Sequence, residues 1–287
     1  MIDRETRMKL LGLDQFPTLP EVMVRILEAI EDDESSAEDL GALLEQDHAI
    51  TVRLLRLANS AFYGFPSQVD TVQRAVVLIG YNEVRLLALA TSVFDTFSQI
   101  RQYALDPRDF WLHALGTAKA ASLLASQMHA QCSPEACFTA GLLHDMGKYA
   151  LAAVLHNTYK KIVANAQERG VLVRDSEREI LNTTHPEVGA WLAQQWSFPE
   201  DLRQPIENLY EYEYAGPYRT ETLIVALSDQ LSRLAGFGVA GDPPTAVVSP
   251  DLLTALNLTD DDVRRRLETL QVHLGDAEHV LDILNGE

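Results

Sequence analysis

Apolar residues recur at spacings of three and four along most of this chain, the pattern of helices with one buried face. In the stretch from Leu19 to Ile30, for example, Val22, Ile26 and Leu27 fall on one side of a helix. No segment shows the two-residue alternation of a half-buried strand. The pattern therefore predicts an all-α protein. Helices are expected over residues 19–31, 36–45, 48–60, 71–78, 83–97, 109–128, 134–145, 151–155, 158–169, 177–181, 184–196, 199–208 and 221–234, with two more after Ser249 and Thr259.

Side chains that can cap a helix mark two of these starts. The run Ser35-Ser36-Ala-Glu-Asp39 places a hydroxyl three residues before an acid, and Thr184-His-Pro-Glu187 does the same with a proline in the first turn. In such a pair the hydroxyl and the carboxylate satisfy amides that the first turn leaves free. We therefore expect helix starts at both places.

Two breaks in the helical pattern divide the chain. Tyr103-Ala-Leu-Asp-Pro107 interrupts helicity, and Gly241-Asp-Pro-Pro-Thr245 has the composition of a linker. We expect a two-lobed helical protein, with an N-terminal lobe over residues 1–105, a second helical lobe over residues 106–236, and a linker with a helical tail over residues 237–287. Leu267, Leu270 and Leu274 of the tail could pack on the body or on a second copy.

The formal charge of −19 narrows the range of partners. An acidic protein repels polyphosphate, so nucleic acid is not an expected partner. The arginines at 53, 56 and 264–266 lie in helical patterns rich in acids or leucines, where solvated or ion-paired faces are the usual outcome. The charged start of the chain carries no signal peptide and no apolar run is long enough for a bilayer, so we expect a cytoplasmic protein without a membrane partner.

The two cysteines, Cys132 and Cys137, have neither redox-motif nor zinc-ribbon spacing. We expect them to be small buried apolar groups and assign them no function.

The adjacent pair His144-Asp145 is the first candidate for chemistry, because it follows a small apolar run and precedes a glycine. Nitrogen and oxygen donors together suit a divalent metal ion. A capped helix end with two hydrogen-bonded side chains is the simpler interpretation of a lone dipeptide. His113 and Asp229 are candidate partners, since both fall on apolar helices where an unpaired polar group would be costly to bury.

In this order the residues resemble the HD superfamily of metal-dependent phosphohydrolases, and more closely the HDOD (HD-related output domain) family of bacterial signalling proteins. The resemblance covers roughly residues 15–235 and extends beyond the candidate ligands. It rests on Phe16-Pro-Thr-Leu-Pro-Glu-Val22, Asp47-His-Ala-Ile-Thr-Val-Arg-Leu-Leu-Arg-Leu-Ala-Asn-Ser60, Ala75-Val-Val-Leu-Ile-Gly80, Phe110-Trp-Leu-His113, Ala140-Gly-Leu-Leu-His-Asp-Met-Gly-Lys148 and His185-Pro-Glu-Val-Gly189.

The resemblance implies an HD-like helical bundle in the C-terminal lobe and a role for each matching residue. His113, His144, Asp145 and Asp229 correspond to the minimal metal set, which favours one divalent ion (Fe, Mn, Zn or Ni) if any binds. Lys148 matches a lysine near phosphate, and His185 matches a further histidine of two-metal sites. Where relatives that hydrolyse cyclic di-GMP carry a His-His pair, this chain has Glu207-Asn-Leu-Tyr210, and Ala215-Gly-Pro-Tyr218 stands at their Gly-Tyr-Pro signature.

Three hypotheses follow. The first is a noncatalytic bacterial signalling module that binds a protein partner, or a small phosphate-containing ligand in a remnant cleft. The second is a metal-dependent phosphohydrolase, with Asp145 taking a proton from water and Lys148 steadying phosphate charge. The third is a scaffold that acts through the leucine-rich tail and a surface formed by Arg53, Arg56 and Asn59. The departures from the two-metal pattern favour the first.

Overall fold

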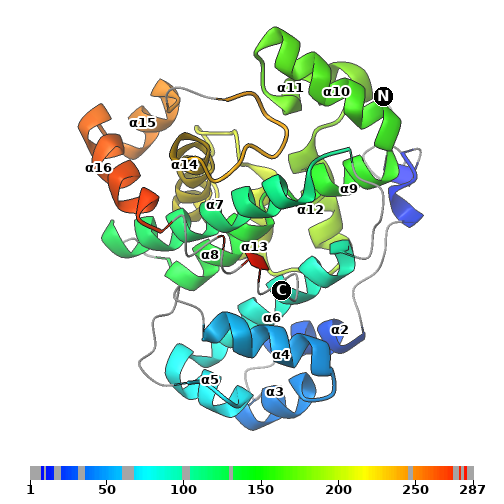
Figure 1. Cartoon of the computed structure of the whole chain (residues 1–287), viewed down its shortest axis with the longest axis vertical. Helices are drawn as coiled ribbons and strands as arrows, with labels where there is room; N and C mark the ends of the chain where they lie inside the picture. Colours follow the sequence, from blue (N-terminus) through cyan, green and yellow to red (C-terminus); the bar gives the residue numbers. More distant parts are fainter. Residues whose placement is uncertain are drawn as a thin grey trace. The chain divides into compact units, whose positions relative to one another are not determined.

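The computed structural model describes residues 8–9, 11–15, 21–31, 36–59, 68–98, 104–128, 132–244, 248–273, 278 and 281–282. Every regular element among them is a helix, which confirms the predicted all-α class (Figure 1). None of the described helices has the length and apolar character needed to cross a lipid bilayer. The chain divides into two compact units, one of Met1–Pro17 with Ile100–Gln271 and one of Thr18–Gln99 with Val272–Glu287.

The first unit contains a short 3-10 helix and ten α-helices among its described residues. They are η1 (Leu13–Gln15), α7 (Pro107–Gln127), α8 (Pro134–Leu143), α9 (Met146–Val154), α10 (His156–Arg169), α11 (Val173–Leu181), α12 (His185–Gln195), α13 (Glu200–Glu207), α14 (Arg219–Ala235), α15 (Pro250–Leu256) and α16 (Asp260–Gln271).

The second unit contains five helices in its described part. They are α2 (Glu21–Glu31), α3 (Ala37–Leu44), α4 (His48–Ala58), α5 (Val72–Ile79) and α6 (Tyr81–Ser98). Helix α6 packs against each of the other four. The side chain of Asn59 makes three hydrogen bonds within this unit. Its amide nitrogen donates to Leu55 O (2.7 Å) and Val69 O (2.6 Å), and its oxygen accepts from Val69 N (2.7 Å).

Both predicted capping signals are found in the structure. Ser36 caps α3 through a capping box with Asp39, and Thr184 caps α12 through a capping box with Glu187. Most starts fall within two residues of the prediction, and two differ by more. Helix α9 begins at Met146, five residues before the predicted start, because the chain turns directly from Asp145 into the helix. Helix α11 begins at Val173, four residues early, and the Val173 amide donates to Asp242 Oδ1 (2.7 Å).

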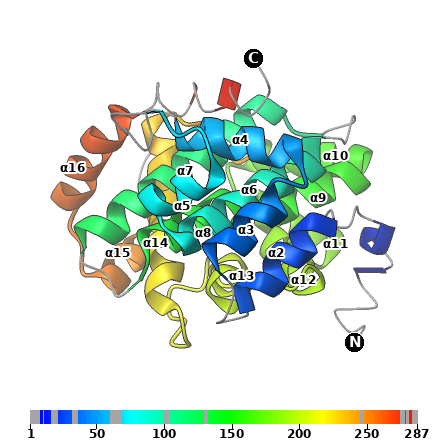
Figure 2. The same cartoon turned by 90° about the horizontal axis from the view of Figure 1, so that it is seen from below.

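Helices α7, α8 and α14 form the centre of the first unit, and each packs against the other two. Helices α15 and α16 lie beside α14 in both views (Figures 1 and 2). Leu270 of α16 is buried, so this part of the tail packs on the unit itself. Leu274 lies outside the described residues.

Helices α9 and α12 approach each other at two glycines. A Cβ atom added to Gly147 would lie 2.0 Å from His185 O and 2.7 Å from Gly189 N. Both obstacles are backbone atoms, so only a residue without a side chain fits at position 147. This close approach brings the start of α9, with Asp145 before it, to the start of α12, with His185.

Candidate metal centre

Four separate elements deliver the candidate ligands. His113 lies in the second turn of α7, His144 ends α8, Asp145 precedes α9, and Asp229 lies in the middle of α14. All four side chains are buried, with exposed fractions of 0%, 0%, 1% and 1% respectively. The structure therefore brings together residues that are far apart in sequence, at the packed centre of the first unit.

The two imidazoles and the two carboxylates face one another. His144 Nε2 lies 3.4 Å from Asp145 Oδ2 and 3.7 Å from Asp229 Oδ1. His113 Nε2 lies 3.1 Å from Asp229 Oδ1 and 3.8 Å from Asp145 Oδ2. His113, His144 and Asp145 each offer a ligand atom within 4.8 Å of the others, so these three could hold a metal ion. Asp229 reaches both histidines from the α14 side.

His144 is oriented as a metal-binding histidine would be. Its Nδ1 donates to Gly141 O (2.6 Å), so Nε2 carries the lone pair when the ring is neutral. Nε2 is buried and makes no hydrogen bond of acceptable geometry. A ring nitrogen in this condition fits a cation or a proton, because an unpartnered buried acceptor is costly.

His113 has hydrogen-bond partners for either tautomer. Its Nε2 can donate to Asp229 Oδ1 at 3.1 Å. Alternatively, its Nδ1 can donate to Ser232 Oγ at 3.4 Å, because the Ser232 hydroxyl itself donates to His113 O (3.2 Å). The second tautomer would leave Nε2 free to bind an ion. The donor set thus fits a divalent metal ion at both histidines.

Two built-in cations already contact the carboxylates. Lys148 Nζ lies 2.9 Å from Asp145 Oδ2 and 2.6 Å from Asp242 Oδ2. Arg233 lies 2.6 Å from Asp229 Oδ2 and 3.5 Å from Asp242 Oδ2. Three carboxylates therefore face two fixed positive charges, which leaves an excess of one negative charge before the histidines are considered.

The excess negative charge affects the pKa values of the two histidines and of the carboxyl groups. Burial alone would lower the pKa of His144, but Asp145 and Asp229 raise it to about 9. For His113 burial prevails over Asp229 and lowers the pKa. Burial opposes ionisation of Asp145 and Asp229, yet the cationic neighbours hold both carboxyl pKa values well below their usual range. Without a metal ion, a proton on His144 offsets the excess negative charge.

His185 lies beside this cluster and has its own buried support. Its Nε2 lies 3.4 Å from Asp145 Oδ1, and its Nδ1 lies 2.8 Å from Glu177 Oε2. Glu177 also accepts hydrogen bonds from the His185 amide (2.7 Å) and the Tyr159 hydroxyl (2.6 Å). A carboxylate behind a histidine fixes the orientation of the ring. Glu177 therefore aims His185 Nε2 at Asp145.

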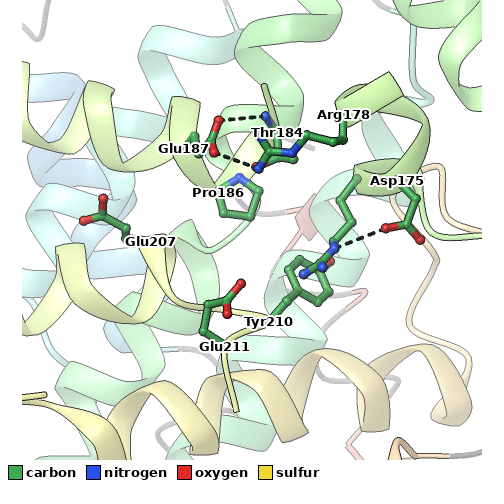
Figure 3. Close-up of a pocket in the computed structure, with 9 residues that line it drawn as sticks. Asp175, Arg178, Thr184, Pro186, Glu187, Glu207, Tyr210 and Glu211 are labelled. Carbon is green, nitrogen blue, oxygen red and sulfur yellow. Dashed lines mark hydrogen bonds and ion pairs between the residues drawn. The ribbon is translucent and has the colours of Figure 1, made fainter. Parts of the chain in front are cut away.

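Tyr210, which contacts His185, also lines a surface hollow of about 140 Å³. The Tyr210 hydroxyl is 3.4 Å from His185 Nε2, and the Arg174 guanidinium lies 4.5 Å from the centre of its ring. Figure 3 shows Arg178 reaching Glu187 across the hollow from Tyr210. Four acidic and two basic side chains line it: Asp175, Glu187, Glu207, Glu211, Arg174 and Arg178.

Sequence reasoning missed three charged residues of this region, namely Arg233, Asp242 and Glu177. Arg233 carried a usable signal, because it lies four residues after Asp229 on the same helix. Asp242 carried none, because it lies in a Gly-Pro segment that the sequence assigns to a linker. Glu177 falls in a polar helix, where a fully buried acid has no local signature.

The all-helical fold of this chain and its buried cluster of two His and two Asp side chains are those of an HD-like helical protein. The model of the HDOD domain family matches residues 16–212, and the chain belongs to this family. Residues 16–20 of that match lie outside the described part of the structure.

Several known proteins are similar to this chain. An HDOD domain protein of unknown function from Geobacter sulfurreducens is 27% identical, with a TM-score of 0.79 over 98% of this chain and 99% of that one. A Shewanella amazonensis SB2B protein, provisionally named a phosphohydrolase, shares the fold at 24% identity and a TM-score of 0.74, over 96% of this chain and 97% of its own. An uncharacterized Treponema pallidum protein is 26% identical over 90% of this chain, which spans only 50% of that relative's length.

Proposed function

We propose that this chain is a regulatory HDOD protein without turnover, whose His and Asp cluster holds at most one divalent metal ion as a structural or sensing element. The observation that supports this most strongly is the pairing of the carboxylates with built-in cations. Lys148 contacts Asp145 and Asp242, and Arg233 contacts Asp229 and Asp242. A second metal ion would have to displace one of these cations.

The burial of the candidate ligands supports the same proposal. His113, His144, Asp145 and Asp229 are at most 1% exposed. The neighbouring hollow is lined by more acids than arginines, which disfavours the approach of a phosphate ester. By the resemblance, the segment Glu207-Asn-Leu-Tyr210 stands where two-metal relatives carry a His-His pair. This segment offers no imidazole to a second divalent ion.

The residues that would hold a single ion are His113, His144 and Asp145, with Asp229 alongside. Nitrogen and carboxylate donors suit Fe, Mn, Zn or Ni. Loading would exchange the proton on His144 for the ion, because a histidine binds metal only in its neutral form. Such an exchange couples metal occupancy to the packing of α7, α8 and α14, and a signalling protein partner would respond to that packing.

A metal-dependent phosphohydrolase is the second candidate, and one observation favours it. His144 Nε2 and Asp145 Oδ1 are buried without a hydrogen bond of acceptable geometry, as expected of ligands prepared for a cation, whereas Asp145 Oδ2 is paired with Lys148. A bound divalent ion would polarise a phosphoryl oxygen and lower the pKa of bound water. For turnover, Lys148 would have to leave Asp145 and contact the phosphate.

Metal analysis combined with an activity panel separates the two candidates. The purified chain is loaded with Mn²⁺ or Fe²⁺ and assayed against phosphomonoesters, phosphodiesters and cyclic dinucleotides. We expect no more than one ion per chain and no turnover above that of Asp145→Asn. The matched control is Asp251→Asn, an exposed aspartate on α15. Turnover that persists in Asp251→Asn and disappears in Asp145→Asn would establish the phosphohydrolase instead.

A further inference from the structure

The only two cysteines of the chain meet at the start of α8. Cys132 Sγ and Cys137 Sγ lie 3.4 Å apart, with the thiol of Cys137 donating to the sulfur of Cys132. Cys132 is half-buried and precedes the N-cap Ser133, whereas Cys137 is fully buried in the second turn of the helix. The thiol of Cys132 is therefore partly accessible to solvent, whereas the thiol of Cys137 is buried next to it.

We propose that Cys132 and Cys137 form a reversible oxidation site, in which a hydroperoxide converts the two thiols into an intramolecular disulfide. The sulfur atoms would have to approach by roughly 1.4 Å to reach the ~2.05 Å of a disulfide bond. Cys132 can supply that movement, because it lies outside α8 and its side chain is not part of the helix cap. The cap itself is made by the Ser133 hydroxyl, which accepts from Glu135 N and Ala136 N (both 3.2 Å).

The hydrogen bond assigns a different role to each sulfur. A donated hydrogen bond stabilises the thiolate of the accepting sulfur, which makes Cys132 the nucleophile and Cys137 the resolving thiol. The same bond lowers the pKa of Cys132, against the opposing effects of burial and of the carboxylate of Glu221. It raises the pKa of Cys137, and burial and Glu221 act in the same direction.

The chemistry then balances in two steps. The Cys132 thiolate attacks one peroxide oxygen, so that an S–O bond forms, the O–O bond breaks, and the leaving oxygen takes up a proton to give water or an alcohol. The sulfur of Cys137 then attacks Cys132 sulfenic acid, so that the S–S bond forms and the hydroxyl leaves as water with the Cys137 proton. Two thiols lose two electrons to one hydroperoxide, and a dithiol reductant reverses the change.

Oxidation would act on the helix that ends at the candidate metal centre. The disulfide would tie the residue before Ser133 to the second turn of α8, and α8 ends at Leu143, directly before His144. It would therefore restrain fraying at one end of a helix whose other end positions His144 and Asp145.

Mass spectrometry of the full chain tests the proposal. The folded protein is treated with hydrogen peroxide, quenched, alkylated with N-ethylmaleimide and digested with trypsin. The segment between Lys119 and Lys148 holds both cysteines and no other lysine or arginine, so one peptide reports on the pair. We expect this peptide to lose two hydrogens and to escape alkylation, and a dithiol reductant to restore two alkylated cysteines.

Two single variants test the separate roles. In Cys137→Ala we expect Cys132 to accumulate as a sulfenic acid that dimedone traps, with no internal disulfide. In Cys132→Ser we expect Cys137 to resist both dimedone and peroxide, because it is buried. Equal peroxide reactivity of Cys137 in Cys132→Ser would overturn the assignment. Disulfide-linked dimers in place of the internal bond would also overturn it. The same holds if the wild-type peptide keeps both thiols at a peroxide dose that modifies Cys132 in Cys137→Ala. If circular dichroism shows Cys137→Ala to be unfolded, the proposal is tested by disulfide formation in the wild type and by the peroxide reactivity of Cys137 in Cys132→Ser.

Discussion

Lys148 and Asp242 form an ion pair that is wholly enclosed by the first unit, with 2.6 Å between Nζ and Oδ2 and exposed fractions of 0% for both side chains. Asp242 also accepts from the Val173 amide (2.7 Å) and lies 3.5 Å from Arg233. One carboxylate after α14 thus fixes the first turn of α9, the start of α11 and the end of α14. It also holds the pKa of Lys148 above its usual value, despite burial, together with Asp145.

Removing this carboxylate should be strongly destabilising. Asp242→Asn keeps the shape of the side chain but leaves Lys148 and Arg233 with one less negative partner in a buried site. Loss of the only partner of a buried charge costs about 3–5 kcal/mol. Lys148 keeps Asp145 and Arg233 keeps Asp229, so we expect a smaller decrease in the free energy of unfolding, of about 2–3 kcal/mol. Urea denaturation measures this change, and the exposed Asp251→Asn control should stay within about 0.5 kcal/mol of the wild type. A loss below about 1 kcal/mol would mean that Asp242 is not the counterion of Lys148.

The contact between α9 and α12 gives a second prediction. In Gly147→Ala the added methyl group would lie 2.0 Å from His185 O, and a backbone atom cannot move aside without shifting a helix. Overpacking typically costs about 1–3 kcal/mol, and we expect the upper end here. Gly170→Ala is the matched control, since a methyl group there meets nothing within 4 Å and only the left-handed φ of +65° is strained. We expect that control to lose about 1 kcal/mol. Similar losses for the two variants would contradict the close approach.

The sequence predicts this fold well, because apolar periodicity and capping residues act locally. The boxes of Ser36 with Asp39 and of Thr184 with Glu187 could be predicted from four residues each. The start of α9 could not, since Gly147 suggests a break when read alone. The places of Gly147 and Lys148 in the helix depend on His185 O and Asp242, which are far away in sequence.

The candidate metal centre, like the fold, could be predicted only in part from the sequence. The positions of His113, His144, Asp145 and Asp229 in apolar helices implied that they must find polar partners, and the structure places them together. The cations Lys148 and Arg233 differ in this respect. Their effect depends on Asp242, whose burial is set by the tertiary packing of a loop and leaves no trace in the local pattern. Sequence reasoning could therefore propose ligands but not the charge balance around them.

The capping box of α12 makes stability depend on pH. Glu187 accepts hydrogen bonds from Arg178 Nη2 (2.7 Å), Thr183 Oγ1 (2.7 Å) and Thr184 N (3.3 Å). Burial opposes its ionisation, but these partners outweigh burial and lower the pKa of the carboxyl group below its ordinary value. A depressed pKa in the folded state means that the unfolded chain binds the proton more tightly. The stabilisation is therefore present above the ordinary pKa of about 4.3 and is lost as the pH falls through the lower folded value.

Glu187→Gln tests this dependence. At pH 7 we expect a loss of about 1 kcal/mol, in the range of a helix cap, because the amide keeps one acceptor oxygen but not the charge. Between pH 5 and pH 3 the difference between wild type and variant should shrink, as the wild-type carboxylate becomes protonated. Urea denaturation at each pH measures it. A difference that stays constant down to pH 3 would show that the charge of Glu187 contributes nothing.

Metal addition should stabilise the chain through His144 in particular. An ion that binds only the folded state adds about 2.7 kcal/mol when its free concentration is 100 times the dissociation constant. Thermal unfolding with and without Mn²⁺ would detect this as a rise in Tm that a chelator reverses. His144→Gln should abolish the rise, because it removes the one buried ring nitrogen among the candidate ligands that has no hydrogen bond. His156→Gln on α10, outside the cluster, should retain it. The control is needed because a chain of charge −19 attracts cations at many surface positions. An equal rise in both variants would place the ion on that surface, whereas a rise lost only in His144→Gln would place it at the centre of the first unit.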